Sequence, residues 1–316
     1  MKRKTLSIQL MGGFGNQVFQ LSQALELLGK NETAFLYQRD PNPDIDRLVE
    51  EIAKRGIDLV RVNKESVHLS SIVDRCIGLL LAIKLGNRHI WPQQPTKFVL
   101  QSIAYLLLKF RFPIKGVYIA RNLGFEDLKP EDREDFIVGY FQSFKSSSNP
   151  LVLDLIRSSL NKIENRKSQN ELSEVQRGTL VLHIRLGDYL KEDKFGVLGI
   201  NYYLSGLELF RTESINEVVV FSDDIEMAKN IYGTPIIRKV RESFGSQVAM
   251  SWVESVNDSV LDTFNLMRIG THFIIANSSF SWWAARSAID SRAKVVAPNP
   301  WFKGMETPSK LYPQEW

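Results

Sequence analysis

The sequence predicts an α/β protein with two Rossmann-like domains that face a cleft. In the C-terminal half, short apolar β-branched runs alternate with helical stretches, and this βαβ rhythm is typical of parallel sheets covered by helices on both faces. The N-terminal half opens with the same unit: a strand, a glycine-rich turn and a helix. Polar residues also recur at the ends of the predicted strands, where such sheets bind ligands.

In the N-terminal half, we expect a helix over Asn16–Leu28 and several short strands bounded by turn residues. These strands are Leu6–Met11, Ala34–Tyr37, Asp58–Val62, Gly116–Ala120 and Phe136–Phe141. After Val62 the pattern becomes more helical and less regular to about Arg111. Within it, the stretches Ile77–Leu85 and Val99–Phe112 are either core helices or a basic amphipathic surface that contacts a membrane.

The C-terminal half alternates more clearly. The expected strands are Thr179–Ile184, Glu217–Phe221, Val248–Val253, His272–Ala276 and Lys294–Pro298. The expected helices are Tyr202–Phe210, Ile225–Ile231, Val260–Ile269 and Phe280–Ile289. The polar stretch Asn161–Gly178 has no apolar periodicity, so we place the boundary between domains 1–165 and 166–316 there.

Composition limits the class of protein. At 316 residues, with 44% hydrophobic and 24% charged residues, the chain is typical of a soluble protein of two ordinary domains. The 40 basic against 36 acidic residues give a net charge of +4, without the basic clusters of a nucleic-acid binder. This charge suits an anionic small ligand or an anionic membrane surface. The single Cys76 forms no intrachain disulfide, and no signal peptide or membrane-spanning stretch is visible, so we expect a cytoplasmic protein.

The polar residues that follow the C-terminal strands predict one nucleotide-like binding site, because ligands of α/β sheets lie beyond the carboxyl ends of the strands. These residues are His183, Arg185, Asp188, Ser222, Asp223, Asp224, Ser251, Glu254, Asn277, Ser278, Ser279, Ser281 and Asn299. Arg185 has the planar, permanently charged fork that suits phosphate oxygens. The alternative is a surface arginine paired with Asp188.

Other motifs allow a functional and a structural interpretation. The run Gly12–Gln17 either lets backbone approach an anion at a helix N-terminus or forms a tight turn without ligand. Its glycine spacing, with Asp40 downstream, almost fits a dinucleotide fingerprint, although the final glycine is missing. Ser222–Asp224 either caps a helix or accepts hydrogen bonds from a nucleobase. The hydroxyl residues around Ser278 either satisfy a helix N-terminus or bind phosphate.

We expect no required metal. Asp44 and Asp46 follow Pro43 in a polar loop, which is typical of a helix start. His68, His89 and His272 have no partners at ligand spacing. Trp282 and Trp283 are better explained by core packing than by sugar stacking, and Leu266 and Met267 are also expected in the core.

Taken together, these residues resemble family 11 glycosyltransferases, the bacterial and animal α-1,2-fucosyltransferases. Four segments carry the resemblance in the family's order. They are the glycine-rich run Gly12–Gln20, the mid-chain run Gly139–Ser143, the signature His183–Tyr189, and Ile275–Trp283 with Asp262–Met267 just before it. The stretch from about Asp40 to Ile114 resembles nothing in the family.

The resemblance implies a two-domain GT-B architecture and inverting, metal-independent transfer from GDP-fucose as donor substrate, without a cofactor. It implies that Arg185 holds the donor diphosphate and stabilises the departing GDP, with His183 and Asp223/Asp224 near the guanine. Asn277, Ser278, Ser279 and Phe280 would line the nucleotide pocket. Asn16, after the turn at Gly13, would reach the cleft on the acceptor side. Asp188 would either act as general base or orient Arg185.

One residue departs from the family signature. Where the family has two adjacent arginines, this chain has Arg185 followed by Leu186. Adjacent side chains that leave a strand diverge, so we expect only one of the two positions to face the phosphates. The departure puts donor binding or activity in doubt more than it does the fold.

We therefore expect an α-1,2-fucosyltransferase that acts on a galactose-terminated glycan of the cell surface, peripheral to the inner face of the membrane. Three alternatives stay open: a transferase that uses another GDP-sugar such as GDP-colitose, an NAD-dependent oxidoreductase, and a catalytically weak saccharide-binding protein. The oxidoreductase would use the glycine-rich turn, but it would leave Arg185 and the Asn277 run without a role.

Overall fold

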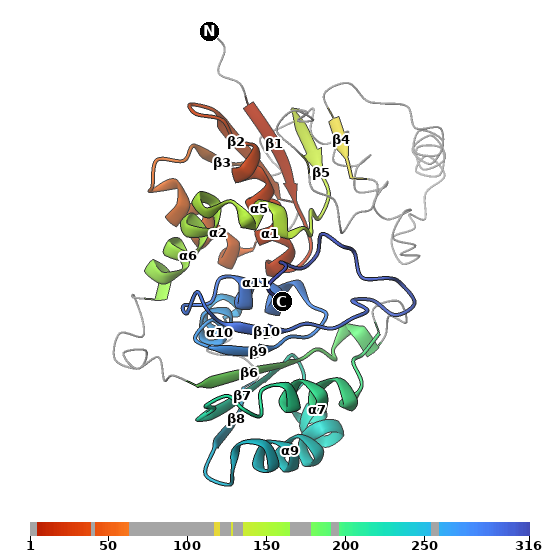
Figure 1. Ribbon diagram of the computed structural model, residues 1–316. Helices are drawn as coiled ribbons and strands as arrows, with labels where there is room; N and C mark the ends of the chain where they lie inside the picture. Colours follow the sequence, from red (N-terminus) through yellow and green to blue (C-terminus); the bar gives the residue numbers. More distant parts are fainter. Residues whose placement is uncertain are drawn as a thin grey trace.

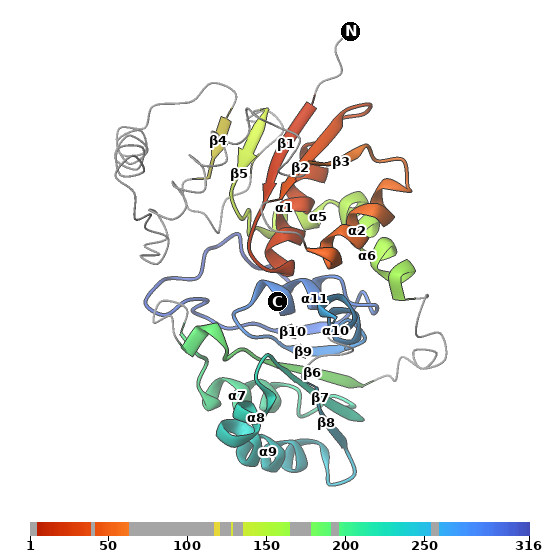
Figure 2. The ribbon, with the colours of Figure 1, turned by 180° about the vertical axis from the view of Figure 1, so that it is seen from behind.

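Two parallel sheets of five strands each form the frame of the molecule. The computed structural model describes residues 5–38, 42–62, 117–120, 128, 135–164, 178–190, 196–253 and 259–316. The strand orders are β3-β2-β1-β5-β4 and β10-β9-β6-β7-β8, and every paired strand is parallel to its neighbour. Figures 1 and 2 show the two sheets in separate lobes, with the C-terminal segment between them. The expected α/β class with two parallel units is confirmed.

The N-terminal lobe contains the strands that the sequence predicts, with ends shifted by a few residues. They are β1 (Thr5–Leu10), β2 (Thr33–Gln38), β3 (Leu59–Val62), β4 (Val117–Ile119) and β5 (Phe136–Val138). The helices described in this lobe are α1 (Phe14–Leu27), α2 (Pro43–Ala53), α5 (Phe144–Ser148) and α6 (Pro150–Glu164). The predicted helical stretches 77–85 and 99–112, with Asp40, Cys76, His68 and His89, lie outside the described residues.

The C-terminal lobe follows the predicted alternation. Its strands are β6 (Thr179–Ile184), β7 (Glu217–Ser222), β8 (Ala249–Val253), β9 (His272–Ile274) and β10 (Lys294–Val296). Its helical elements are η4 (Asp188–Leu190), α7 (Ile200–Leu209), α8 (Ile225–Ala228), η5 (Lys229–Gly233), α9 (Thr234–Phe244), α10 (Val260–Met267) and α11 (Ser279–Arg286).

Helices α5, α6 and α9 were not predicted from the sequence, and α9 has an identifiable reason for this. It begins beside Gly233 and Pro235, residues that usually interrupt helices. Pro235 occupies the first turn, where its missing N–H is not needed and its fixed φ suits a helix. The helical stretch predicted at Ile225–Ile231 therefore continues, through the single π-helical turn η5, into a second helix.

The packing around strand β6 explains why its sequence is mostly apolar. Leu180, Leu182 and Ile184 belong to a core that also contains residues of α7 and α9. Val181, which points to the other face, belongs to a second core with residues of α10 and α11. Both faces of the central strand are covered, as in other parallel sheets, so neither face is exposed to solvent.

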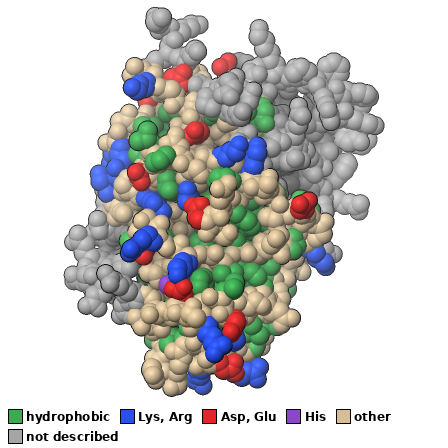
Figure 3. Space-filling view, in the orientation of Figure 1, with side chains coloured by type: hydrophobic (Ala, Val, Ile, Leu, Met, Phe, Trp, Pro, Cys, Tyr) green, Lys and Arg blue, Asp and Glu red, His purple; other side chains and the backbone are tan. Residues whose placement is uncertain are grey.

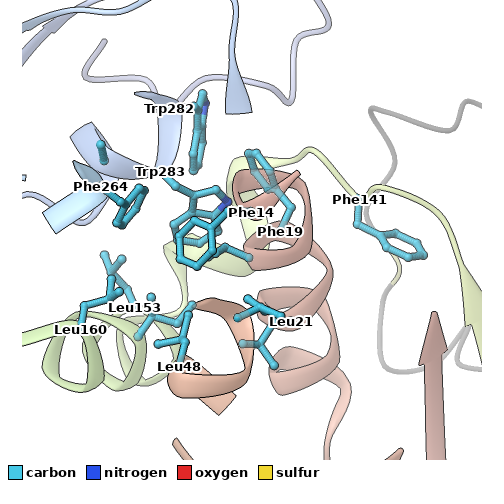
Figure 4. Close-up of a cluster of buried hydrophobic side chains, with 14 of the residues drawn as sticks. Phe14, Phe19, Leu21, Leu48, Phe141, Leu153, Leu160, Phe264, Trp282 and Trp283 are labelled. Carbon is cyan, nitrogen blue, oxygen red and sulfur yellow. The ribbon is translucent and has the colours of Figure 1, made fainter. Parts of the chain in front are cut away.

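The second core continues from one lobe into the other. Phe14 of α1 lies 5.0 Å from Phe264 of α10, and Phe19 lies 5.2 Å from Trp283 of α11, measured between ring centroids. Figure 4 shows these rings gathered between the three helices. Trp282 and Trp283 have no exposed surface, so their predicted core role is confirmed. The lobes therefore share one apolar core.

Gly15 sets how closely α1 and α11 approach each other. A Cβ atom at this position would lie 2.4–2.5 Å from backbone atoms of Ser279 and Phe280, which is too close for any real Cβ contact. The first turn of α1 thus rests directly on the first turn of α11. The glycine is required here by a contact between the lobes rather than by a backbone conformation.

The C-terminal segment strengthens this junction. The Trp282 indole Nε1 donates a hydrogen bond to the Leu311 carbonyl (3.0 Å), and the Phe144 N–H donates to the Lys310 carbonyl (2.9 Å).

The first sheet ends at Val138 and the second begins at Thr179, but residues 165–177 lie outside the described part of the chain. The boundary at residue 165 therefore stays a prediction. Among the described residues, no helix is long and apolar enough to span a membrane.

Candidate active site

The strand order places the four motif segments at two equivalent points of the fold. In the C-terminal sheet the chain runs outward from β6 through β7 to β8, and then returns to the other side of β6 as β9 and β10. The carboxyl ends of β6 and β9 flank this switch point, where α/β sheets bind their ligands. Arg185 follows β6 and Asn277 follows β9. In the N-terminal sheet, Gly12–Asn16 follow β1 and Gly139–Ser143 follow its neighbour β5.

Two carboxylates hold Arg185 at the C-terminal switch point. Its Nε and Nη2 donate to Asp188 Oδ1 at 3.1 and 2.7 Å, and its Nη1 lies 3.1 Å from Asp223 Oδ2. The Arg185 side chain keeps 29% of its surface exposed. The ion pair with Asp188 that the structural interpretation expects is therefore confirmed, whereas the contact with a diphosphate stays a prediction. Because Asp188 Oδ1 accepts both hydrogen bonds, the geometry favours an orienting role for this carboxylate.

Tyr189 and Gly187 complete the setting of Arg185, and the sequence analysis gave neither a role. The Arg185 guanidinium lies 5.5 Å from the centre of the Tyr189 ring, and the Tyr189 hydroxyl donates to the Asn277 carbonyl at 2.8 Å. Burial raises the pKa of Tyr189, so it remains a donor. A Cβ on Gly187 would meet Asp223 Oδ2 at 2.3 Å. The glycine thus allows Asp223 to approach the chain.

Leu186 points away from this site. Its side chain is fully buried in the core that also contains Ile184, on the opposite face from Arg185. Its backbone N–H donates to Asp223 Oδ1 at 2.9 Å. The expected divergence of the two adjacent side chains is confirmed. The departure from the family signature therefore lies in the core rather than among the groups that face the crevice.

His183 is buried directly beneath the site. Only 4% of its surface is exposed, its ring lies 6.3 Å from that of Phe280, and within the described residues Nδ1 has no hydrogen-bond partner. Burial, and then the neighbouring charge of Arg185, lower the pKa of His183 to about 3. The imidazole is therefore neutral at physiological pH.

The acidic segment after β7 has two roles. Ser222 and Asp224 form the start of helix α8, whereas Asp223 contacts Arg185. Asp224 is the N-cap of α8 and accepts from the Met227 N–H at 3.1 Å, and Ser222 Oγ accepts from the Asp224 N–H at 3.1 Å. This is the capping that the structural interpretation predicts. Asp223 instead holds Arg185. Contact of either carboxylate with a guanine stays a prediction.

The segment after β9 forms the start of helix α11 and hydrogen-bonds to a neighbouring loop. Asn277 is buried, and its Nδ2 donates to the Gly196 carbonyl at 3.1 Å. Ser278 is the N-cap of α11, with its Oγ accepting from the Phe280 N–H at 3.3 Å. Ser279 and Phe280 are half-buried where α1 meets α11. Their role as a nucleotide pocket stays a prediction.

At the N-terminal switch point, the described residues that follow β1 and β5 are uncharged up to Phe144. Gly12 has a φ of +77°, and Gly13 is exposed, with open space where a Cβ would lie. Asn16 is half-buried, and its Oδ1 accepts from Gln142 Nε2 at 2.7 Å. Gln142 is a site residue that the sequence analysis did not single out, although it lies in the mid-chain motif.

The neighbouring carboxylates Asp44 and Asp46 belong to the start of helix α2. The Asn42 side chain caps α2, Asp44 and Asp46 lie in its first turn, and Asp46 forms an ion pair with Arg61 at 2.5 Å. The predicted helix start is confirmed. Burial is the main cause that raises the pKa of Asp46. The polar residue Glu254 lies outside the described residues.

The comparisons with known proteins identify the family of the chain. Residues 124–316, more than half of the chain, match the family model described as Glycosyl transferase family 11. The chain belongs to glycosyl transferase family 11. The matched region contains three of the four motif segments and the whole C-terminal sheet.

Two curated relatives match almost the full length of this family 11 chain, and both come from Escherichia coli. The O-antigen biosynthesis glycosyltransferase WbnK is 28% identical over 97% of this chain and 98% of its own length. An alpha-1,2-colitosyltransferase is 26% identical over 98% of this chain and 96% of its own.

Among solved structures, Escherichia coli heptosyltransferase WaaC with ADP has a TM-score of 0.42 at 8% identity, covering 94% of this chain and 88% of that chain. WaaC with ADP-2-deoxy-2-fluoro heptose has a TM-score of 0.39 at 7% identity, over 94% and 89% of the two chains.

Proposed function

We propose that the protein transfers fucose, or the related deoxy sugar colitose, from its GDP derivative to the 2-hydroxyl of a terminal galactoside, with inversion at the anomeric carbon. The product would be part of an O-antigen or another cell-surface glycan. The observation that carries this proposal is the partly exposed Arg185 at the C-terminal switch point, held in place by two carboxylates. The names of the two curated relatives support the reaction class and keep both sugars open.

Arg185 suits a departing diphosphate. Breaking the bond between the anomeric carbon and the phosphate oxygen leaves negative charge on GDP, and the sugar becomes oxocarbenium-like by analogy with glycoside hydrolysis. A guanidinium already fixed beside the leaving oxygens stabilises that charge without first having to reorganise. Asp188 accepts from Nε and Nη2, and Asp223 lies against Nη1, so each guanidinium nitrogen has a carboxylate neighbour. On this proposal, the second N–H groups of Nη1 and Nη2 bind the phosphates.

The positions of the helices support an anion in the same place. Helices α1 and α11 bring their first turns together at Gly15 and Ser279. The N-terminal turns of helices carry partial positive charge and unpaired N–H groups, both of which favour phosphate oxygens. Arg185 would supply the full charge, and the helix ends the remaining hydrogen bonds. On this proposal the reaction needs no metal ion.

The test is transfer from a panel of GDP-sugars to a set of galactosides, with the products identified by mass and each reaction repeated in EDTA. The native chain should use GDP-fucose or GDP-colitose, and EDTA should change nothing. Arg185→Ala should lower kcat by about 100- to 1,000-fold, the usual effect of losing one donor to a developing oxyanion. Turnover near the native level in that variant, or a product at another hydroxyl, would contradict the assignment.

Two further candidates are separated by binding. NADH, rather than GDP, would raise the melting temperature of an oxidoreductase. A saccharide-binding protein would bind galactosides without consuming any GDP-sugar. In a folded family 11 chain, we expect stabilisation by GDP.

A further inference from the structure

Gln142 pairs with Asn16 across the N-terminal switch point. Gln142 follows β5 and Asn16 lies in the first turn of α1, so the contact joins segments 126 residues apart. The Gln142 Nε2 donates to Asn16 Oδ1 at 2.7 Å. Gln142 is 8% exposed, whereas Asn16 is half-buried. A buried amide therefore orients one that reaches the surface.

The backbone before Gln142 is strained. Phe141 has a φ of +50°, in the left-handed region that a bulky aromatic residue rarely occupies. Its ring is fully buried, and its carbonyl accepts from the Ser143 N–H at 2.7 Å. Such a conformation is unfavourable and persists where the surroundings enforce it, often at functional sites. Its effect here is to direct Gln142 towards Asn16.

Gln142 also lowers the stability of the protein at this position. Its Oε1 is buried and has no hydrogen-bond partner among the described residues. An unsatisfied buried oxygen lowers stability, so an apolar side chain of similar size would be the more stable choice. Stability therefore does not explain the glutamine, but its bond to Asn16 does.

Gly12 keeps space for the other end of the Asn16 amide. A Cβ on Gly12 would lie 2.7 Å from Asn16 Nδ2 and 3.1 Å from the Tyr140 ring. Gly12 itself is exposed, so Nδ2 lies at an open part of the turn. One residue before Asn16, Gly15 rests on the start of α11, which places this amide beside the junction of the lobes.

We propose that Gln142 is a positioning residue for the transfer reaction. By fixing Asn16 Oδ1 it turns Asn16 Nδ2 outward, as a hydrogen-bond donor to an oxygen of the ligand at the junction of the lobes. The inference rests on the proposed function. That oxygen is a phosphate or hydroxyl oxygen of the GDP-sugar, or a hydroxyl oxygen of the galactoside. The Michaelis constants for the two substrates distinguish these sources.

The deciding substitution is Gln142→Glu, which keeps the shape but replaces the amide N–H₂ donor with an acceptor. Asn16 must then rotate its amide to donate to the carboxylate, and it presents Oδ1 to the ligand instead. Gln142→Glu and Gln142→Ala should both lower kcat/KM by at least about tenfold, equivalent to 1.4 kcal/mol. In an Asn16→Ala background neither should have a further effect, because Gln142 acts through Asn16.

The matched control is Gln23→Ala. Gln23 is another buried glutamine, on the same helix, whose amide bonds to the Leu128 N–H and carbonyl. Its loss should lower the melting temperature without coupling to Asn16→Ala in kcat/KM. Native-like kcat/KM in Gln142→Glu, or additive effects of Gln142→Ala and Asn16→Ala, would overturn the positioning role.

Failure of the proposed function gives a different result. If the native chain transfers no sugar from the panel, the reaction assignment fails on its own. The same single and double variants are then compared by their affinity for GDP and for galactosides. Coupling between positions 16 and 142 in either affinity would support the positioning role, and its absence in both would overturn it.

Discussion

The two switch points have the same topology but hold opposite kinds of side chain. After β6, a charged residue, Arg185, is held by Asp188 and Asp223. After β1, an uncharged residue, Asn16, is held by Gln142. The strand order fixes where a ligand meets each lobe, and the side chains fix what chemistry it meets there. Charge suits a diphosphate, whereas amides suit hydroxyl groups, so the difference agrees with donor binding at the C-terminal lobe.

The glycines of the two turns also serve different contacts. Gly187 lets a carboxylate approach the backbone beside Arg185, whereas Gly15 lets a whole helix rest against α1.

On the face shown in Figure 3, basic and acidic side chains are interspersed and form no continuous basic stripe. On this face, therefore, no broad surface charge distinguishes the two lobes.

The largest expected effect comes from breaking the contact between the lobes. In Gly15→Ala the new Cβ has backbone rather than a flexible side chain in its way, so α1 and α11 must separate. Overpacking of this kind costs about 1–3 kcal/mol or more, and we expect a large loss of both stability and transfer. Urea unfolding measures the stability. Gly13→Ala is the control, because position 13 has extended backbone and open space, and an equal loss there would contradict the argument.

The next effect tests the missing second arginine. Leu186→Arg places a charge in a fully buried position, so we expect the free energy of unfolding to fall by roughly 3 kcal/mol or more, with no gain in transfer. Leu186→Met, which nearly conserves volume, should cost less than about 1.5 kcal/mol. Higher activity in a stably folded Leu186→Arg variant would show that this position faces the phosphates after all.

A smaller effect distinguishes the two carboxylates that hold Arg185. Asp223→Ala removes an ion pair and leaves the Leu186 N–H without its acceptor, for a loss of about 1–3 kcal/mol. Asp188→Ala removes an exposed pair, whose loss costs about 0–1 kcal/mol. Urea unfolding of both variants measures the order, and a larger loss for Asp188 would reverse our ranking.

The last expected effect is a pH dependence. The folded pKa of His183 is about 3, against an ordinary value of 6.5, so the unfolded chain takes up the proton first. The stability contributed by neutral His183 is complete above about pH 6.5 and decreases as the pH falls towards 3, by at most about 1.4 kcal/mol per unit. Unfolding free energies at pH 7 and pH 5 should therefore differ less in His183→Asn than in the native chain. An unchanged difference would contradict this assignment.

The residues that sequence patterns located well are those whose environment depends on near neighbours. The short, mostly apolar run Thr179–Ile184 predicts β6, and the alternation along the strand predicts that Arg185 and Leu186 diverge. Helix α9 was missed because a proline such as Pro235 favours the first turn of a helix but disrupts the interior of one.

The partners of the site residues were harder to predict. Asp223 was expected near a nucleobase, yet it holds Arg185, and Gln142 was part of a motif without a role. Each of these contacts joins segments that lie far apart in the sequence and meet only because β7 and β5 pair with the central strands. No spacing in the sequence encodes such a meeting, because it depends on the strand order.

The sequence by itself determined the alternating elements, the two glycine-rich or charged turns and the family, because these depend on residue type and short-range period. The tertiary structure decided what each residue contacts. It placed Gly15 against α11, Leu186 in the core and Gln142 beside Asn16. The physical reason is that close packing and hydrogen bonding act between neighbours in space, and the fold of two parallel sheets alone defines those neighbours.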